Sequence, residues 1–204
     1  MTRAVPRHFF GILADKYFDL DCKWGVSLSD IKRAKPWHNY QRCKKAGLTF
    51  RKFNQRDMKF LAELYASTRA EEVASTGWGE KQTQLFLQQQ FDAQHSHYQE
   101  QYPDADWLVV IKSRQRIGRI YLERWPSQHR LIDIALVPKM QGQGLGVAMI
   151  LDLMDEAKSV DKALSLHVEK FNPAKDLYLS IGFEVLADKG VYDLMAWPKG
   201  SAVR

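Results

Sequence analysis

A glycine-rich stretch, PKMQGQGLG, joins an apolar run to an amphipathic segment, and this junction restricts the fold more than any other feature. The run before it, Leu131 to Val137, is a strand candidate. Apolar residues after it recur at helical spacing: Val147, Ile150, Leu151, Met154 and Ala157. Alternating glycines expose backbone N–H groups, and a helix start adds the positive end of its dipole. A strand, loop and helix in this order predict a phosphate site.

Two common phosphate loops do not fit this stretch. A P-loop requires lysine and then serine or threonine after its last glycine, whereas Val147 and Ala148 follow here. A dinucleotide fingerprint requires G-x-G-x-x-G. Counting from Gly142 or Gly144 places Val147 or Met149 at the final glycine position. On local sequence alone, a strand-to-helix turn without any ligand stays open as the alternative.

Outside this junction, strand and helix candidates alternate along the chain. Short β-type runs lie at 48–53, 106–112, 116–125, 130–137, 163–169, 183–187 and 191–197. Helical patterns cover Gln55 to Ser67, Glu80 to Tyr102, the segment after the glycines, and Pro173 to Ser180. The predicted order is β-α-α-β-β-β-α-β-α-β-β, which indicates a mixed α/β fold.

Charge and cysteine content restrict the class of protein. Residues 1–46 hold ten Lys/Arg and four Asp/Glu, whereas residues 47–204 hold twenty of each, so the net charge of +6 belongs to the first segment. Two cysteines do not make a disulfide scaffold and fit a reducing compartment. No apolar stretch is long enough to span a bilayer. We therefore expect a cytoplasmic protein without a membrane partner.

The stretch IALVPKMQGQGLG resembles the coenzyme-binding motif of the GNAT N-acetyltransferase superfamily, a glutamine or arginine followed by spaced glycines. Gln141, Gly144 and Gly146 match it, and Gly142 is an additional glycine. Downstream, HVEKFNPAKDLYLSIGF resembles the second signature of the same family. The resemblance implies a central mixed, mostly antiparallel sheet flanked by helices. It divides the chain into a basic extension, 1–46, and an acetyltransferase domain, 47–204.

The resemblance implies acetyl-CoA as the donor and no metal. The pyrophosphate of acetyl-CoA would bind the backbone of the glycine loop, formed by Gln141, Gly142, Gln143, Gly144, Leu145 and Gly146. Its pantetheine arm would pair with the strand edge of Ala135, Leu136 and Val137, where a backbone N–H would polarise the thioester carbonyl. By the same resemblance, Asn172 would contact the coenzyme near the pantetheine.

Two proton transfers need side chains. Tyr178 matches the family's general acid, and its alternative role is that of a core aromatic residue. Asp133 and Glu123 are the candidates for the base, because a carboxylate within an apolar strand is costly unless it is used or paired. His167 is a third candidate. Many members of the family rely on ordered water instead of a fixed base.

The resemblance implies a primary amine as acceptor, on a small molecule or a peptide, and it allows a homodimer. Glu71, Glu72 and Trp78 would lie on the acceptor side, unless their segment is only a capped loop. A non-catalytic acyl-CoA-binding or sensing module is the alternative function.

Two other patterns have less support. Nucleic-acid binding through the basic stretch Lys32 to Lys45 is a further alternative, which we do not favour over a solvated arm. One set of cysteines and histidines matches no zinc spacing: His8, Cys22, His38 and Cys43.

Overall fold

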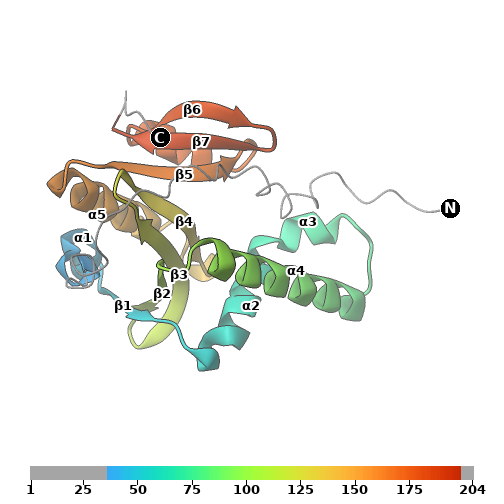
Figure 1. Ribbon diagram of the computed structural model, residues 1–204. Helices are drawn as coiled ribbons and strands as arrows, with labels where there is room; N and C mark the ends of the chain where they lie inside the picture. The colour runs from blue at the N-terminus through green and yellow to red at the C-terminus, as the bar shows by residue number, and fades with distance from the viewer. Residues whose placement is uncertain (1–35, 199–204) are drawn as a thin grey trace.

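The computed structural model describes residues 36–198 of the 204-residue chain. A seven-stranded sheet forms its centre, with strand order β1-β2-β3-β4-β5-β7-β6 (Figure 1). The strands are β1 (Leu48–Lys52), β2 (Asp106–Lys112), β3 (Gln115–Arg124), β4 (Gln128–Leu136), β5 (Ala163–Glu169), β6 (Glu184–Lys189) and β7 (Tyr192–Trp197). Among these strands β4 and β5 pair in parallel, and every other neighbouring pair is antiparallel. The predicted mixed, mostly antiparallel sheet is confirmed.

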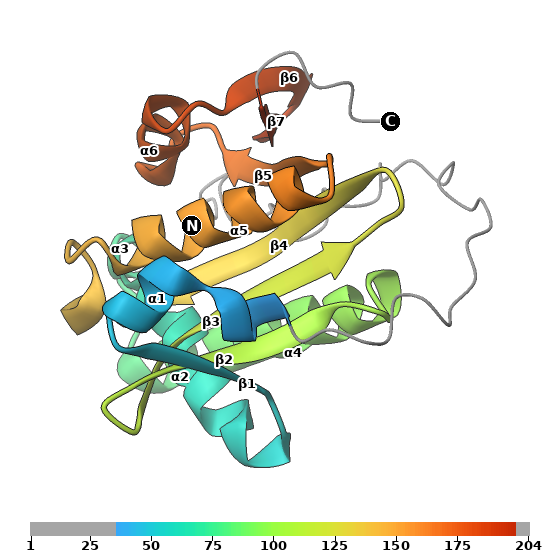
Figure 2. The same ribbon diagram turned by 90° about the vertical axis from the view of Figure 1, so that its left-hand side faces the viewer.

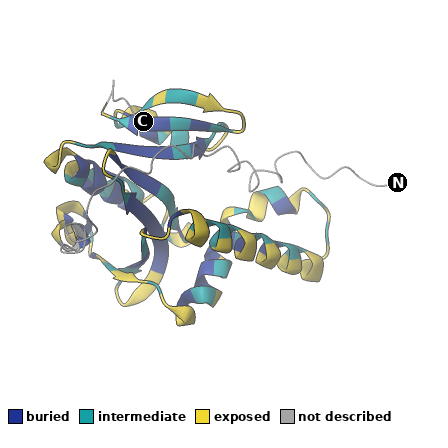
Figure 3. Cartoon of the chain, viewed as in Figure 1, coloured by how far each residue is buried: buried dark blue, intermediate teal, exposed yellow. Residues whose placement is uncertain are grey.

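Helices cover both faces of the sheet (Figure 2). The α-helices are α1 (Gln41–Lys45), α2 (Met58–Thr68), α3 (Ala70–Ala74), α4 (Glu80–Gln101), α5 (Leu145–Ser159) and α6 (Ala174–Ser180), and the 3-10 turns are η2 (Pro36–Asn39), η3 (Gln55–Asp57) and η4 (Pro138–Met140). One apolar cluster packs α1, α5 and α6 against the sheet, and a second packs α2, α3 and α4. Burial is concentrated in the strands, whereas α4 is exposed along most of its length (Figure 3).

The predicted helix over Gln55–Ser67 begins one turn later than the pattern suggests. Its first three residues form η3, and α2 follows. Asn54 explains this start, because its side-chain oxygen accepts the N–H of Arg56 at 2.9 Å. The carboxylate of Asp57 accepts the N–H of Asn54 in return, also at 2.9 Å. This reciprocal cap satisfies donors that a helix start leaves without a partner.

The end of the basic segment 1–46 is part of the packed structure. Three of its residues are buried in the cluster that holds α5: Trp37, Tyr40 and Cys43. Asp152 of α5 is also buried, and it accepts the backbone N–H groups of Arg42 and Cys43 at 3.2 and 2.8 Å. A carboxylate from α5 therefore caps α1. The domain boundary after Ala46 stays a prediction, and packed residues precede it.

Two other predictions, on membrane spans and on a zinc site, can be compared with the described residues only. None of the described helices combines the length and the apolar character needed to cross a membrane. Of the residues considered for zinc, His8, Cys22 and the side chain of His38 lie outside the described part of the chain. Cys43 is fully buried. Within the described residues, no group of three or more His, Cys, Asp or Glu side chains is placed to hold a metal ion.

Candidate active site

The parallel pairing of β4 with β5 stops halfway along both strands. It runs from Gln128 opposite Ala163 to Leu131 opposite Leu166. Beyond that point β4 continues to Leu136 and remains paired with β3, while β5 diverges from it (Figure 1). Within the described part of the chain, the last residues of β4 therefore have one backbone edge outside the ladder. Such an edge can accept an extended, peptide-like ligand.

Leu136 is the residue of the predicted segment Ala135 to Val137 that faces this open edge. The N–H of Val137 donates to the carbonyl of Ile117 at 2.8 Å, and its carbonyl accepts the N–H of Met140 at 2.9 Å. Both backbone polar groups of Val137 are thus hydrogen-bonded within the chain. Leu136 lies opposite Gly118, one position before Val137. Because hydrogen-bonded and non-hydrogen-bonded pairs alternate in an antiparallel ladder, the N–H of Leu136 points away from β3.

A bond to the glycine loop supports this orientation of Leu136. The Nε2 group of Gln141 donates to the Leu136 carbonyl at 2.8 Å. Gln143 makes a similar bond to the carbonyl of Lys139, also at 2.8 Å. Both glutamine side chains therefore hold the loop against the segment that precedes it. Their predicted role in coenzyme binding rests on their backbone groups.

The glycine loop leads directly into α5, as predicted. Gly142 and Gly144 have φ values of +69° and +74°, a conformation that L residues rarely adopt. The N–H of Ala148 donates to the Gly144 carbonyl at 2.9 Å, which is the first bond of the helix. The N–H groups of Leu145, Gly146 and Val147 precede that ladder and are the natural donors for an anion.

Gly146 is different from the other two glycines. Its φ lies outside the left-handed region, and a Cβ atom built on it would meet nothing within 4 Å. Alanine would be the better residue in this first helical turn by about 0.5–1 kcal/mol. The folded chain by itself therefore does not require glycine here. Close approach of a ligand to the backbone would require it.

Tyr178 lies on α6 with its ring packed 5.6 Å from that of Phe183. Its side chain is buried, and burial raises its pKa to about 12, with a further contribution from the negative charge of Asp133. The hydroxyl is therefore protonated at neutral pH, as a general acid must be. The structure brings Tyr178 and Asp133 within electrostatic reach of each other.

Asn172 opens α6. Its Oδ1 accepts the N–H of Ala174 at 2.9 Å, and its carbonyl accepts the N–H of Lys175 at 2.9 Å. The residue is exposed, and its side chain has a structural role as a cap. The cap uses its oxygen and leaves the amide nitrogen for the predicted contact with the coenzyme.

Asp133 is held by a buried arginine that the sequence reading missed. Arg119 of β3 donates to it through Nε at 3.0 Å and Nη2 at 2.8 Å. Arg119 also donates to the side-chain oxygen of Gln94 on α4 at 3.2 Å, and the negative charge of Asp133 raises its pKa despite burial. The sequence feature that could have indicated this ion pair is an arginine within the apolar run RIGRIYLE, on the strand that precedes the one with Asp133.

The other two candidates for the base have different surroundings. Glu123 is opposite Arg130, five residues along β3 from Gly118, which is about 17 Å. Its carboxylate accepts a bond from Trp125 Nε1, and burial raises its pKa. The side chain of His167 contacts Arg130, and burial together with that positive charge lowers its pKa to about 3. Glu123 is thus remote from the open edge of β4, whereas His167 lies one residue past the last β5 residue that pairs with β4 and is engaged by Arg130.

A polar corner lies between α2, α3 and the end of β5. Arg69 contacts Glu72 at 2.8 Å and Glu169 at 3.2 Å, and its guanidinium lies 5.8 Å from the centre of the Tyr65 ring. The sequence predicted Glu72 on the acceptor side but did not reveal Arg69 or Glu169. Tertiary packing places Glu72 beside the strand that diverges from β4.

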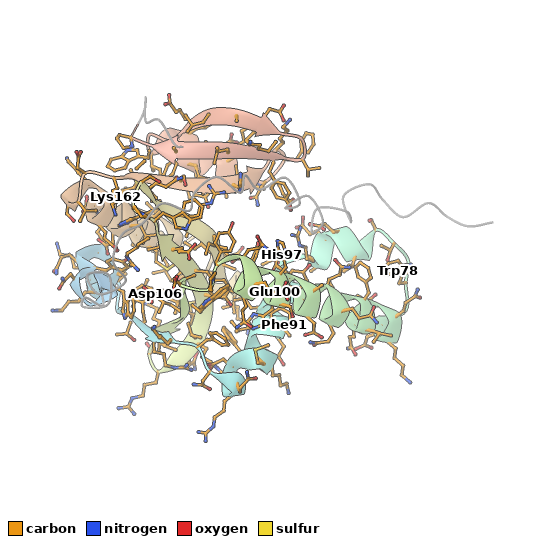
Figure 4. The ribbon with its side chains drawn as sticks, viewed as in Figure 1. Trp78, Phe91, His97, Glu100, Asp106 and Lys162 are labelled. Carbon is orange, nitrogen blue, oxygen red and sulfur yellow. The ribbon has the colours of Figure 1, made fainter. Side chains whose placement is uncertain are left out.

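The other two residues predicted on the acceptor side lie farther from this corner or face outward. Glu71 lies on the outer surface of α3. Trp78 packs against Phe86, with ring centres 5.0 Å apart, at the end of α4 remote from the sheet (Figure 4). Of the three residues, Glu72 is thus the one that packing draws toward the sheet.

Comparison with known proteins agrees with this geometry. The model of the acetyltransferase (GNAT) family matches residues 68–183, more than half of the chain. The matched range includes the open edge of β4, the glycine loop and Tyr178. The comparison with curated proteins found no match.

Solved structures of acetyltransferases share the fold. PaiA N-acetyltransferase from Thermoplasma acidophilum, in complex with coenzyme A, has 19% identity and a TM-score of 0.56, covering 73% of this chain and 97% of its own. An acetyltransferase from Thermus thermophilus has 17% identity and a TM-score of 0.53, covering 73% and 95%. FdhC, a nucleotide-linked sugar GNAT in its apo form, has 14% identity and a TM-score of 0.54, covering 75% and 87%. On the evidence of the family match, the chain belongs to the GNAT acetyltransferase family.

Proposed function

We propose that the protein moves the acetyl group of acetyl-CoA directly onto a primary amine, in a ternary complex without a covalent enzyme intermediate. The assignment of acetyl-CoA as the donor rests on Gly146. It is a glycine without a conformational or packing reason in the first turn of α5. A pyrophosphate that approaches the backbone closely supplies that reason. The GNAT family uses acetyl-CoA, whose pyrophosphate has this chemistry.

The two ends of the donor would bind two neighbouring parts of the chain. The N–H groups at the start of α5 bind the pyrophosphate. The edge of β4 at Leu136 binds the peptide-like arm as an added strand would. The Leu136 N–H also donates to the thioester carbonyl, and this bond strengthens as negative charge develops on the oxygen in the transition state.

Tyr178 gives its proton to the departing thiolate. Burial and the charge of Asp133 keep the hydroxyl protonated, because both oppose formation of the phenolate. The thiolate leaves as a neutral thiol, which favours the forward reaction. We retain Tyr178 as the general acid because its hydroxyl carries a proton at neutral pH, and the tyrosinate that it leaves regains a proton from solvent.

We assign the proton of the attacking amine to water and not to a protein carboxylate. Asp133 is engaged by Arg119 through both oxygens, and Glu123 lies at the other end of β3. Asp133 then acts as a positioning residue, because its ion pair with Arg119 joins β3 to β4. This assignment replaces Asp133 and Glu123 as candidate bases.

The acceptor belongs to the class of small-molecule or peptide amines. The corner formed by Arg69, Glu72 and Glu169 carries one positive and two negative charges, so a cationic amine meets a favourable potential there. We further propose that the protein acts in the cytoplasm and forms homodimers.

Coenzyme release from purified full-length protein tests this function. Acetyl-CoA is incubated with a panel of polyamines, amino sugars, amino acids and lysine peptides, and free thiol is followed with time. We expect turnover with at least one class of amine and none without an amine. Tight binding of acetyl-CoA without turnover across the panel would contradict the proposal and support an acyl-CoA-sensing module.

A further inference from the structure

A dense run of positive charge continues past the N-terminal segment into the folded domain. Residues 31–60 hold ten Lys/Arg and one Asp/Glu, a net charge of +9. Lys112, Arg114 and Arg116 add three more positive charges within five residues. Like charges at this density repel one another and favour a negative partner.

Tertiary contacts bring nine of these thirteen charges to elements at or next to one edge of the sheet. β1 is the edge strand, and its Leu48 lies opposite Lys112 of β2. The Lys112 ammonium donates to the carbonyl of Ala46, and Arg116 donates to the carbonyl of Arg56 at 3.1 Å. Figure 2 shows α1 and β1 side by side at this edge. We call the following set the β1 patch: Lys44, Lys45, Arg51, Lys52, Arg56, Lys59, Lys112, Arg114 and Arg116.

Internal ion pairs neutralise the β1 patch only in part. Both Nη atoms of Arg51 contact the buried carboxylate of Asp57 at 2.7 Å, and Arg116 contacts it at 3.2 Å. Two further pairs are long: Lys52 with Asp106 at 3.7 Å, and Lys59 with Glu63 at 3.9 Å. Nine cations against these three carboxylates leave an excess of six positive charges. Arg51 and Arg116 remain about 40% exposed, so they can still reach an external anion.

We propose that the β1 patch binds the phosphate backbone of nucleic acid. Arginine and lysine on an exposed surface are the groups that contact phosphates, and each contact releases a counterion. Protein–protein interfaces usually bury an apolar centre. Among the described residues, the exposed large apolar side chains all lie outside the β1 patch: Leu85, Val160, Phe171, Leu179, Val185 and Val191.

The chemistry of the β1 patch also limits what it recognises. Its aromatic neighbours, Phe50 and Phe60, are at least partly buried, and the guanidinium of Arg116 lies 5.1 Å from the centre of the Phe60 ring. Stacking on exposed bases requires free aromatic faces. Binding should therefore depend on charge and not on base sequence.

The β1 patch and the acetyl-transfer site can be used together. β1 is separated from β4 by β2 and β3, so three strand spacings, about 14 Å, lie between the edge strand and the edge at Leu136. Lysine on an edge strand also prevents edge-to-edge aggregation, which is the structural alternative. That role would not produce specific binding to polyanions.

Fluorescence anisotropy of a labelled 20-base-pair duplex with the full-length chain tests the proposal. The patch variant replaces three exposed cations for which the described residues show no ion pair: Lys44→Gln, Lys45→Gln and Arg114→Gln. The matched control removes three exposed lysines elsewhere: Lys81→Gln, Lys158→Gln and Lys189→Gln. Both variants change the net charge equally, and neither touches the acetyl-transfer site. An unchanged rate of coenzyme release in both variants would show that the fold is intact.

We expect the wild-type association constant to fall with salt at a logarithmic slope of about −5, and the patch variant to reduce that slope by about 3. The control variant should bind like the wild type. The proposal fails if the duplex does not bind at 50 mM salt, or if both variants lose affinity equally. It also fails if polyglutamate of the same charge competes as well as unlabelled duplex, since that result indicates an acidic protein partner.

Discussion

Arg119 contacts both carboxylate oxygens of Asp133, through Nε at 3.0 Å and Nη2 at 2.8 Å, and this pair joins β3 to β4 where β4 leaves β5. Removing one partner leaves a buried charge without compensation, at a cost of about 3–5 kcal/mol. We expect Asp133→Ala to lose this much stability in urea unfolding. The double variant Arg119→Met, Asp133→Leu should recover most of it, because no charge is left buried.

The same double variant tests whether Asp133 takes the proton of the amine. If water accepts the proton of the amine, the folded double variant should keep kcat within about tenfold of the wild type at pH 8. A stable double variant with a loss of 100-fold or more would show that the carboxylate is the base.

Tyr178→Phe should lower kcat by about 100-fold or more and leave the KM for acetyl-CoA nearly unchanged, because only the transition state loses a proton donor. The raised pKa of Tyr178, about 12, adds a second expectation. The wild-type rate should not fall with deprotonation of this group below pH 10. Equal rates for Tyr178→Phe and the wild type would remove the tyrosine from the mechanism.

Gly146→Ala separates the needs of the fold from those of the ligand. The substitution favours the helix by about 0.5–1 kcal/mol and meets no neighbour, so the melting temperature should stay the same or rise. Affinity for coenzyme A, measured by calorimetry, should fall at least about tenfold, since a methyl group obstructs the approach to the backbone.

Gly79→Ala is the matched control for Gly146→Ala. Gly79 precedes α4 and also has no neighbour within 4 Å of a built Cβ, but it lies outside the proposed site. Its substitution should not alter coenzyme affinity. An unchanged dissociation constant in Gly146→Ala would remove the pyrophosphate from the first turn of α5.

Stability should decrease as pH falls below about 6.5, because the buried His129 and the half-buried His167 are neutral in the folded state. Burial lowers the pKa of His129 from 6.5 to about 4, although Glu156 opposes the shift, and burial beside Arg130 lowers that of His167 to about 3. The unfolded chain binds these protons first, so protonation favours unfolding. Each histidine should contribute a loss of about 2 kcal/mol at pH 5 relative to pH 8.

Urea unfolding of the wild type and His129→Gln at pH 8 and pH 5 measures this effect. The variant should lose less stability between the two pH values than the wild type does. Identical losses would show that His129 is accessible to protons in the folded state.

Deleting residues 1–46 should destabilise the protein strongly, whereas deleting 1–35 keeps every contact that α1 makes with α5. The longer deletion removes Tyr40 and Cys43 from the core and leaves the buried carboxylate of Asp152 without its N–H donors. An uncompensated buried carboxylate costs several kcal/mol. Calorimetry should show a melting temperature at least about 8 °C lower for the longer deletion than for the shorter one. Equal values would place the domain boundary at Ala46.

The sequence by itself determined the order of the major strands and helices and the glycine-rich junction between β4 and α5. Both are local properties. The spacing of apolar residues distinguishes β4 from α5. Gly142 and Gly144 have a backbone conformation that few other residues adopt. Motif resemblance then led from a phosphate loop to the acetyltransferase family, and the family match confirms it.

Only the tertiary structure decided which groups face one another. Register placed Leu136 and not Val137 at the open edge, because strand pairing fixes the direction of every N–H. Packing paired Asp133 with Arg119, and it assembled the β1 patch from α1, β1, the start of α2 and the hairpin between β2 and β3. These relationships join residues far apart in sequence, so no local pattern contains them.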